Sequence, residues 1–111
     1  MRRDEYEEIS AEAAKAELGN ENYDLLSAAI GSSGTVRISY IPAFTEEKTT
    51  DENGNIVYVE VENSASKSYE YAGLIPIGFY LSDSAHLWAY HKAHDRRESY
   101  ACNRIITVTA E

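Results

Sequence analysis

The spacing of hydrophobic residues changes once along this chain, near residue 35. Before that point, apolar residues recur every three or four positions, as expected for a helix with one face against a core. Within residues 3–18 the recurring positions are Tyr6, Ile9, Ala13 and Ala16. The sequence Gly19-Asn20 ends this predicted helix. Its apolar stripe is narrow, which fits either a peripheral helix on its own domain or a helix that packs against a partner chain, for instance in a homodimer.

A second, shorter helix is predicted from Asn22, a favourable N-cap residue, to Ile30. The sequence GSSG at residues 31–34 ends it. This glycine pair lacks the lysine and the preceding strand of a phosphate-binding P-loop, so we reject that interpretation. The pattern in the N-terminal third of the chain therefore predicts two helices, at residues 3–18 and 22–30.

From Thr35 onward, apolar and polar residues alternate, which indicates strands. Val36, Ile38 and Tyr40 share one face of a first strand that ends at Pro42. Residues 44–63 read as a hairpin, with Asn53-Gly54 at the two positive-φ positions of a type I′ turn. Further strands are predicted at residues 69–75, 77–81, 86–92 and 97–109. Two helices followed by five or six short antiparallel strands favour a small closed or half-closed β-barrel.

Composition and charge limit the number of domains, the kind of partner and the cellular compartment. The chain has 111 residues, which fits one domain. Its net charge of -9 predicts no binding to duplex DNA, because phosphate repels an acidic surface whose cations do not cluster. A single cysteine excludes an internal disulfide and fits a reducing compartment. The acidic start differs from a signal peptide, and the apolar runs are too short to cross a bilayer. We expect a soluble, cytoplasmic protein without membrane contact.

Residues 86–108 hold all three histidines. His86 and His91 differ by an odd number, so in one strand they point to opposite faces, and a three-histidine metal site is not expected. His94 and Asp95 are adjacent in a predicted turn and are not aligned as base and orienting group. Glu98 beside Arg97 reads as a surface ion pair. The sequence therefore predicts no catalytic residues, no metal and no cofactor.

The same stretch contains the one local cluster of cationic and aromatic residues in this acidic chain. Guanidinium groups match phosphate or carboxylate, and aromatic rings stack on bases. The alternative is that Tyr100, Cys102 and Ile106 are core residues and the arginines are solvated; the two interpretations weigh about equally. The candidate ligand-binding residues are Arg37, Tyr40, Tyr90, His91, Arg97, Tyr100 and Arg104.

The order of segments "AAI…VRISY…P…HLWAY…RRESYACNRIITV" resembles the WYL domain from about Leu25 to Val108. The matching pieces are Ile38-Ser39-Tyr40, Pro76, Leu87, Ala89-Tyr90, Tyr100 and Arg104-Ile105. The departures are Ala85 and His86 at the signature Trp and Tyr, and Glu98 and Ala101 at two basic positions. The resemblance implies an Sm-like, SH3-type small antiparallel β-barrel at residues 21–111. It leaves residues 1–20 as a peripheral helix and the hairpin at about 44–63 as an insertion.

WYL domains usually follow a helix-turn-helix in bacterial transcription regulators, or accompany CRISPR-Cas and phage-defence systems. The resemblance therefore implies a non-enzymatic regulatory module that senses a nucleotide or a short single-stranded nucleic acid. The rival hypothesis is an acidic protein-interaction module, an accessory or inhibitor that binds a basic partner in a nucleic-acid-handling complex. Retained Arg97 and Arg104 favour the first hypothesis, and the lost cations at Glu98 and Ala101 favour the second.

Overall fold

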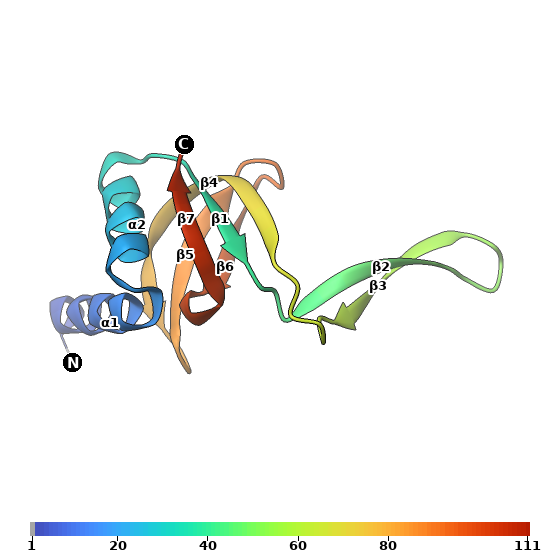
Figure 1. Cartoon of the computed structure of the whole chain (residues 1–111), viewed down its shortest axis with the longest axis horizontal. Coiled ribbons are helices and arrows are strands. Elements are labelled where there is room, and N and C mark those ends of the chain that lie inside the picture. The colour runs from blue at the N-terminus through green and yellow to red at the C-terminus, as the bar shows by residue number, and fades with distance from the viewer. Residues whose placement is uncertain (1) are drawn as a thin grey trace.

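The structure is a computed structural model that describes residues 2–111 (Figure 1). Two helices, α1 (Arg3–Leu18) and α2 (Asn20–Ser32), precede the strands, as predicted. A short 3-10 turn, Cys102–Arg104, lies between the last two strands. The strands are β1 (Val36–Tyr40), β2 (Phe44–Thr50), β3 (Ile56–Glu62), β4 (Tyr69–Leu81), β5 (Ala85–His91), β6 (Arg96–Ala101) and β7 (Ile105–Ala110). Neither described helix is long and apolar enough to span a membrane.

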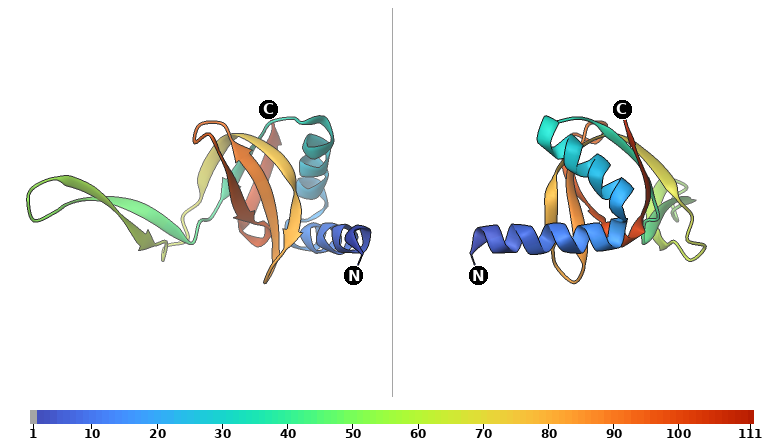
Figure 2. Two further views of the ribbon diagram at one scale, coloured as in Figure 1. Left: turned by 180° about the vertical axis from the view of Figure 1, so that it is seen from behind. Right: turned by 60° about the vertical axis from the view of Figure 1, so that its left-hand side comes forward.

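Five strands form one curved antiparallel sheet in the order β6-β5-β4-β1-β7. Figure 2 shows α1 and α2 packed against this sheet on the side away from the β2–β3 hairpin. The mainly-β fold with two N-terminal helices is therefore confirmed. β6 and β7 are the two edges, and they do not pair with each other in the described chain, so the sheet is open and the expected closed barrel is not confirmed.

Strand alternation defines an inner and an outer face of this sheet. In β5, Ala85, Leu87, Ala89 and His91 are buried, whereas His86, Trp88 and Tyr90 are less buried. We call the face of the first set the inner face and that of the second set the outer face. The largest fully buried side chains are those of Leu26, Ile38, Leu74, Leu87, Val36, Cys102 and Ser10. The core thus lies between the inner face and the two helices.

The predicted bounds of α1 are confirmed, but its predicted buried stripe is wrong. Ser10, Ala14 and Leu18 are the buried residues, whereas Ile9 is 42% exposed. Small side chains at positions 10 and 14 let the helix approach the sheet closely, which overrides the apolar periodicity. Tyr6 remains at the edge, where its hydroxyl accepts a hydrogen bond from the Leu81 backbone N–H at 3.1 Å.

Asn22 does not cap α2, which begins at Asn20 instead. Inside the helix, the Asn22 side chain donates to the Ile106 carbonyl at 3.0 Å and accepts from the Val108 N–H at 3.2 Å. These bonds satisfy backbone groups of the edge strand β7, where the sheet offers no neighbouring strand. The polar residue that resembled a cap therefore joins the helix to the sheet edge.

The hairpin β2–β3, which we call the arm (residues 44–62), is a separate two-stranded sheet. It projects from the body, and the molecule measures 54 × 29 × 24 Å (Figure 1). The predicted type I′ turn is wrong: residues 51–55 form a longer loop in which Gly54 alone has a positive φ, of 82°. Asp51 Oδ1 accepts hydrogen bonds from the N–H groups of Asn53 and Asn55, both at 2.9 Å, and these bonds select the wider loop.

Candidate functional site

The sheet divides the predicted ligand residues between its two faces. Tyr90 and Arg97 are opposite each other in the β5–β6 register and lie on the outer face. His91 and Tyr100 lie on the inner face, where Tyr100 contacts Tyr40 edge-on with ring centroids 5.2 Å apart. The five residues named above therefore do not form one ligand-binding surface.

The other two predicted arginines have partners of their own. Arg37 lies on β1 with its Nη1 3.6 Å from a carboxylate oxygen of Glu70. Arg104 lies in the 3-10 turn, and its Nη1 donates to the Ile41 carbonyl at 3.2 Å. This bond holds the turn against the end of β1, which is a structural role.

The inner face carries a row of aromatic rings. Tyr71, which sequence reasoning missed, lies 6.0 Å from Tyr40, 5.8 Å from Tyr100 and 6.4 Å from His91, measured between ring centroids. His91 in turn stacks on His94, with centroids 3.9 Å apart and planes 9° apart. The row runs from the core to the turn between β5 and β6. The sequence signal for it was the alternation of Tyr69 and Tyr71 in β4, together with Tyr40 at the end of β1.

Glu98 collects three hydrogen bonds at the end of this row. His94 Nδ1 lies 2.7 Å from its Oε1, Arg96 Nε donates to Oε1 at 2.8 Å, and the Tyr100 hydroxyl donates to Oε2 at 2.8 Å. Burial alone would raise the pKa of Glu98, but these bonds outweigh burial and lower the pKa to about 2. Burial, followed by the Glu98 carboxylate, raises the pKa of Tyr100. The carboxylate is therefore a fixed anion.

The predicted Glu98–Arg97 ion pair is wrong, and Arg96 is the partner instead. Neighbours in a strand point to opposite faces, whereas residues two apart share a face. Glu98 and Arg96 thus face inward, and Arg97 faces outward. The predicted strand at residues 97–109 was therefore enough to show that Arg97 and Glu98 point to opposite faces.

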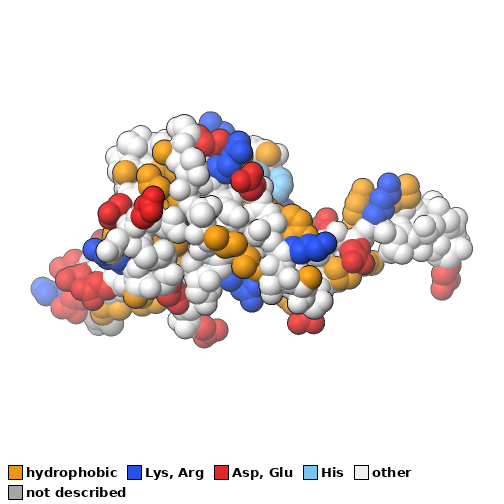
Figure 3. Space-filling model, in the orientation of Figure 1, with side chains coloured by type: hydrophobic (Ala, Val, Ile, Leu, Met, Phe, Trp, Pro, Cys, Tyr) orange, Lys and Arg blue, Asp and Glu red, His pale blue; other side chains and the backbone are white. Residues whose placement is uncertain are grey.

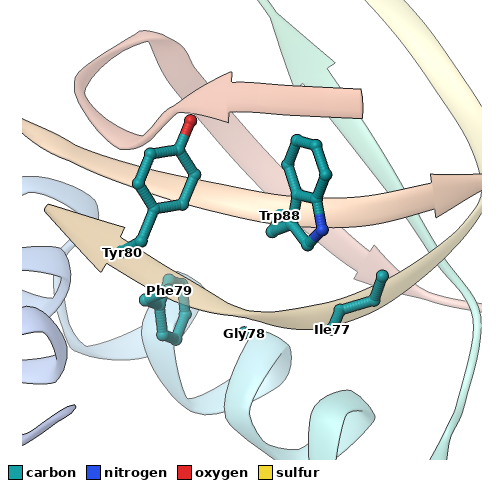
Figure 4. A pocket seen from close by; sticks show the side chains of 5 residues that line it. All are labelled: Ile77, Gly78, Phe79, Tyr80 and Trp88. Carbon is teal, nitrogen blue, oxygen red and sulfur yellow. The ribbon is translucent and has the colours of Figure 1, made fainter. Parts of the chain in front are cut away.

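The outer face has a shallow hollow of about 450 Å³ over β4 and β5, lined by Ile77, Gly78, Phe79, Tyr80 and Trp88 (Figure 4). Gly78 is opposite Trp88 in the register, and the absent side chain leaves the space. Figure 4 shows the Tyr80 and Trp88 rings on the same side of the strands and Phe79 on the other side, toward the helices. Tyr80 lies edge-on to Trp88 at 6.2 Å. Sequence reasoning missed both rings.

The arm has two different faces. Register pairs Thr45–Val61, Glu47–Val59 and Thr49–Val57 place three valines, two threonines and Glu47 on one face. The other face, which we call the acidic face, consists of Phe44, Glu46, Lys48, Thr50, Ile56, Tyr58, Glu60 and Glu62. On the acidic face Glu46 is directly opposite Glu60. Figure 3 shows hydrophobic and charged side chains together along the arm.

Comparison of the chain with protein-family models, curated proteins and solved structures found no match. The geometry therefore offers three features from which to infer function: the projecting arm, the outer hollow and the inner row that ends at Glu98.

Proposed function

We propose that this chain is a non-enzymatic protein-interaction module whose arm binds a partner with a basic surface. The observation that carries the proposal is the projection of the arm from the body with large apolar side chains in solvent. Phe44 is 55% exposed, Ile56 61% and Tyr58 66%. An isolated two-stranded hairpin is marginally stable in water, and exposed apolar surface of this kind marks interaction sites.

Charge indicates the chemistry of the partner. The arm carries six acidic residues and one lysine. Glu46 and Glu60 are opposite each other, and like charges in that position are destabilising. A cationic group from a partner would relieve this repulsion, while the neighbouring Tyr58 and Phe44 would supply apolar contact. A groove that binds nucleic acid has this complementary character, so the module is an accessory to, or an inhibitor of, a nucleic-acid-handling protein.

The test is capture of partners by the tagged native chain from host lysate, followed by calorimetry with the purified partner. The variant E46K/E60K reverses two charges on the acidic face. The matched control, E8K/E12K, makes the same change in charge on exposed positions of α1. We expect E46K/E60K to weaken binding at least about tenfold and to reduce its salt dependence, and the control to bind nearly as the native chain does. Equal loss of affinity in both variants would show that only net charge matters and would count against the arm as the binding site. Native affinity in E46K/E60K would refute the proposal.

A nucleotide or short single-stranded nucleic acid is the second candidate partner, and the outer hollow is what favours it. Trp88 and Tyr80 offer apolar rings for a base, and Arg97 lies two pairs away from the Trp88–Ser99 pair on the same face. Gly78→Val would fill the hollow, because a Cβ there meets nothing within 4 Å.

Calorimetry with a panel of nucleotides and short oligonucleotides tests this candidate. Both Gly78→Val and Arg97→Ala should abolish or weaken binding, the latter by about ten- to a hundredfold. Arg104→Ala should instead lower stability, since Arg104 holds the 3-10 turn. Absence of heat from a folded native chain would exclude this ligand class.

We also propose that the open sheet is a divergent Sm-like, SH3-type barrel of the WYL kind. Without the arm, β1, β4, β5 and β6 run as a meander, and β7 returns beside β1 after the 3-10 turn. This order supports the proposed kinship, and with it a regulatory, CRISPR-Cas or phage-defence role in the cytoplasm.

A further inference from the structure

We propose that His91, His94 and Glu98 form a binding site for one divalent transition-metal ion, with zinc as the best match. One potential ligand atom from each residue lies within 4.8 Å of those of the other two. The third histidine, His86, is not part of this site, because it lies on the outer face.

The turn between β5 and β6 brings the three residues together. Asp95 has a φ of 51°, and its N–H donates to the Lys92 carbonyl at 3.3 Å. This reversal folds His94 back over His91, the last residue of β5. Glu98 enters from the opposite strand on the same face. Three ligands on one hairpin are thus assembled by local structure.

The ligand types suit zinc. Zinc takes histidine nitrogens at about 2.0–2.1 Å and carboxylate oxygens at about 2.0–2.2 Å, and two histidines with one glutamate is a known ligand set. His94 must leave the stack so that its nitrogen points toward those of the other ligands. It can do so because its side chain lies in a turn and is 46% exposed. Three protein ligands leave a fourth position for water.

The surroundings fix two of the three ligands. His91 is 5% exposed and packs beside Tyr71, so its ring is held. The Tyr100 hydroxyl orients the Glu98 carboxylate through Oε2, as partners beyond the metal ligands commonly do. Arg96 competes with the metal ion for Glu98, because the Arg96 Nε lies 2.8 Å from Oε1 of that carboxylate. Its side chain is 69% exposed and can withdraw.

The experiment is titration of the chelator-stripped full chain with zinc chloride by calorimetry, with circular dichroism to check folding of each variant. We expect one saturable site at micromolar zinc. His94→Ala and Glu98→Gln should each weaken binding at least about tenfold. The matched control, His86→Ala, should leave the affinity unchanged. Arg96→Gln should raise the affinity several-fold, because it removes the competing cation from Glu98.

The outcomes decide the proposal. Loss in His94→Ala and Glu98→Gln with retention in His86→Ala supports the site. Absence of saturable binding to the native chain overturns it. Native affinity in folded His94→Ala overturns it as well, even where Glu98→Gln fails to fold. Loss in His86→Ala would move the metal to the outer face and equally overturn this assignment.

Discussion

The acid sensitivity of the fold should depend on Glu98. Hydrogen bonds from Arg96, His94 and Tyr100 overcome the opposing effect of burial and lower the pKa of Glu98 from 4.5 to about 2. At about 1.4 kcal/mol per pH unit, this difference corresponds to roughly 3 kcal/mol of stability. The Glu98 side chain is 20% exposed, so solvent screening reduces this figure to about 2–3 kcal/mol. Because the folded-state pKa is the lower one, this stability is present above about pH 4.5 and is lost as the pH falls toward about 2.

Glu98→Gln removes the charge but keeps one acceptor oxygen. We expect it to lower the free energy of unfolding by about 2–3 kcal/mol at pH 7 and nearly as much at pH 5, and by progressively less at pH 4 and 3. Urea unfolding at these pH values measures the difference. Glu60→Gln is the control, because it removes the same charge from the arm, outside this cluster. Parallel native and Glu98→Gln curves between pH 5 and 3 would refute the assignment of Glu98 as the stabilising anion.

Three other predictions concern the arm, the cysteine and metal removal. Replacing residues 44–62 with Asn-Gly should shift the thermal midpoint by less than about 4 °C, because the Asn63 N–H already donates to the Ala43 carbonyl at 2.9 Å and a two-residue turn can join these positions; a collapse of the midpoint would show that the arm stabilises the body. Cys102 is fully buried, and burial raises the pKa of its thiol to about 12, so iodoacetamide should label it only after urea unfolding; rapid labelling at pH 8 without urea would contradict this. Chelator should leave the chain folded at room temperature and lower the thermal midpoint of the zinc-loaded chain only by the modest amount that a micromolar site contributes, because the core lies among apolar residues around Leu26 and Ile38; unfolding by chelator would mean that metal holds the fold.

Local periodicity was sufficient to predict most of the elements. The bounds of α1, the alternation through β1 and β5, and the arm all follow from short-range patterns that tertiary contacts did not override. Periodicity failed where a contact outside the element decided the outcome. Ser10 is buried because its small size suits a close helix–sheet approach, and a polar residue carries no such signal in a hydrophobic pattern. Asn22 had the signature of a cap, but its amide pairs with β7, more than eighty positions away.

The candidate sites show the same contrast between features that follow from local sequence patterns and features that depend on tertiary contacts. Parity along β5 and β6 already separates Tyr90 and Arg97 from His91 and Tyr100, so the sequence could have excluded one common ligand surface. The meeting of His94 with Glu98 depended on the geometry of the turn at Asp95, whose positive φ no pattern of apolar residues indicates. The hollow at Gly78 depended on register, since a glycine is informative only when the residue opposite it is known to be Trp88.

The arrangement of these features argues that binding and folding are carried by different parts of the chain. The helices and the arm lie at opposite ends of the molecule, so a partner held by the arm need not touch the helices (Figure 1). Glu98, in contrast, is joined to the core through Tyr100 and to the surface through Arg96. A ligand that engages Glu98, whether a metal ion or a proton, therefore acts on stability directly. The charge of Glu46 on the acidic face adds to the effect of Glu98 that raises the pKa of Arg96, so the arm is coupled electrostatically to this cluster, and stability must be measured beside binding to distinguish the two sites.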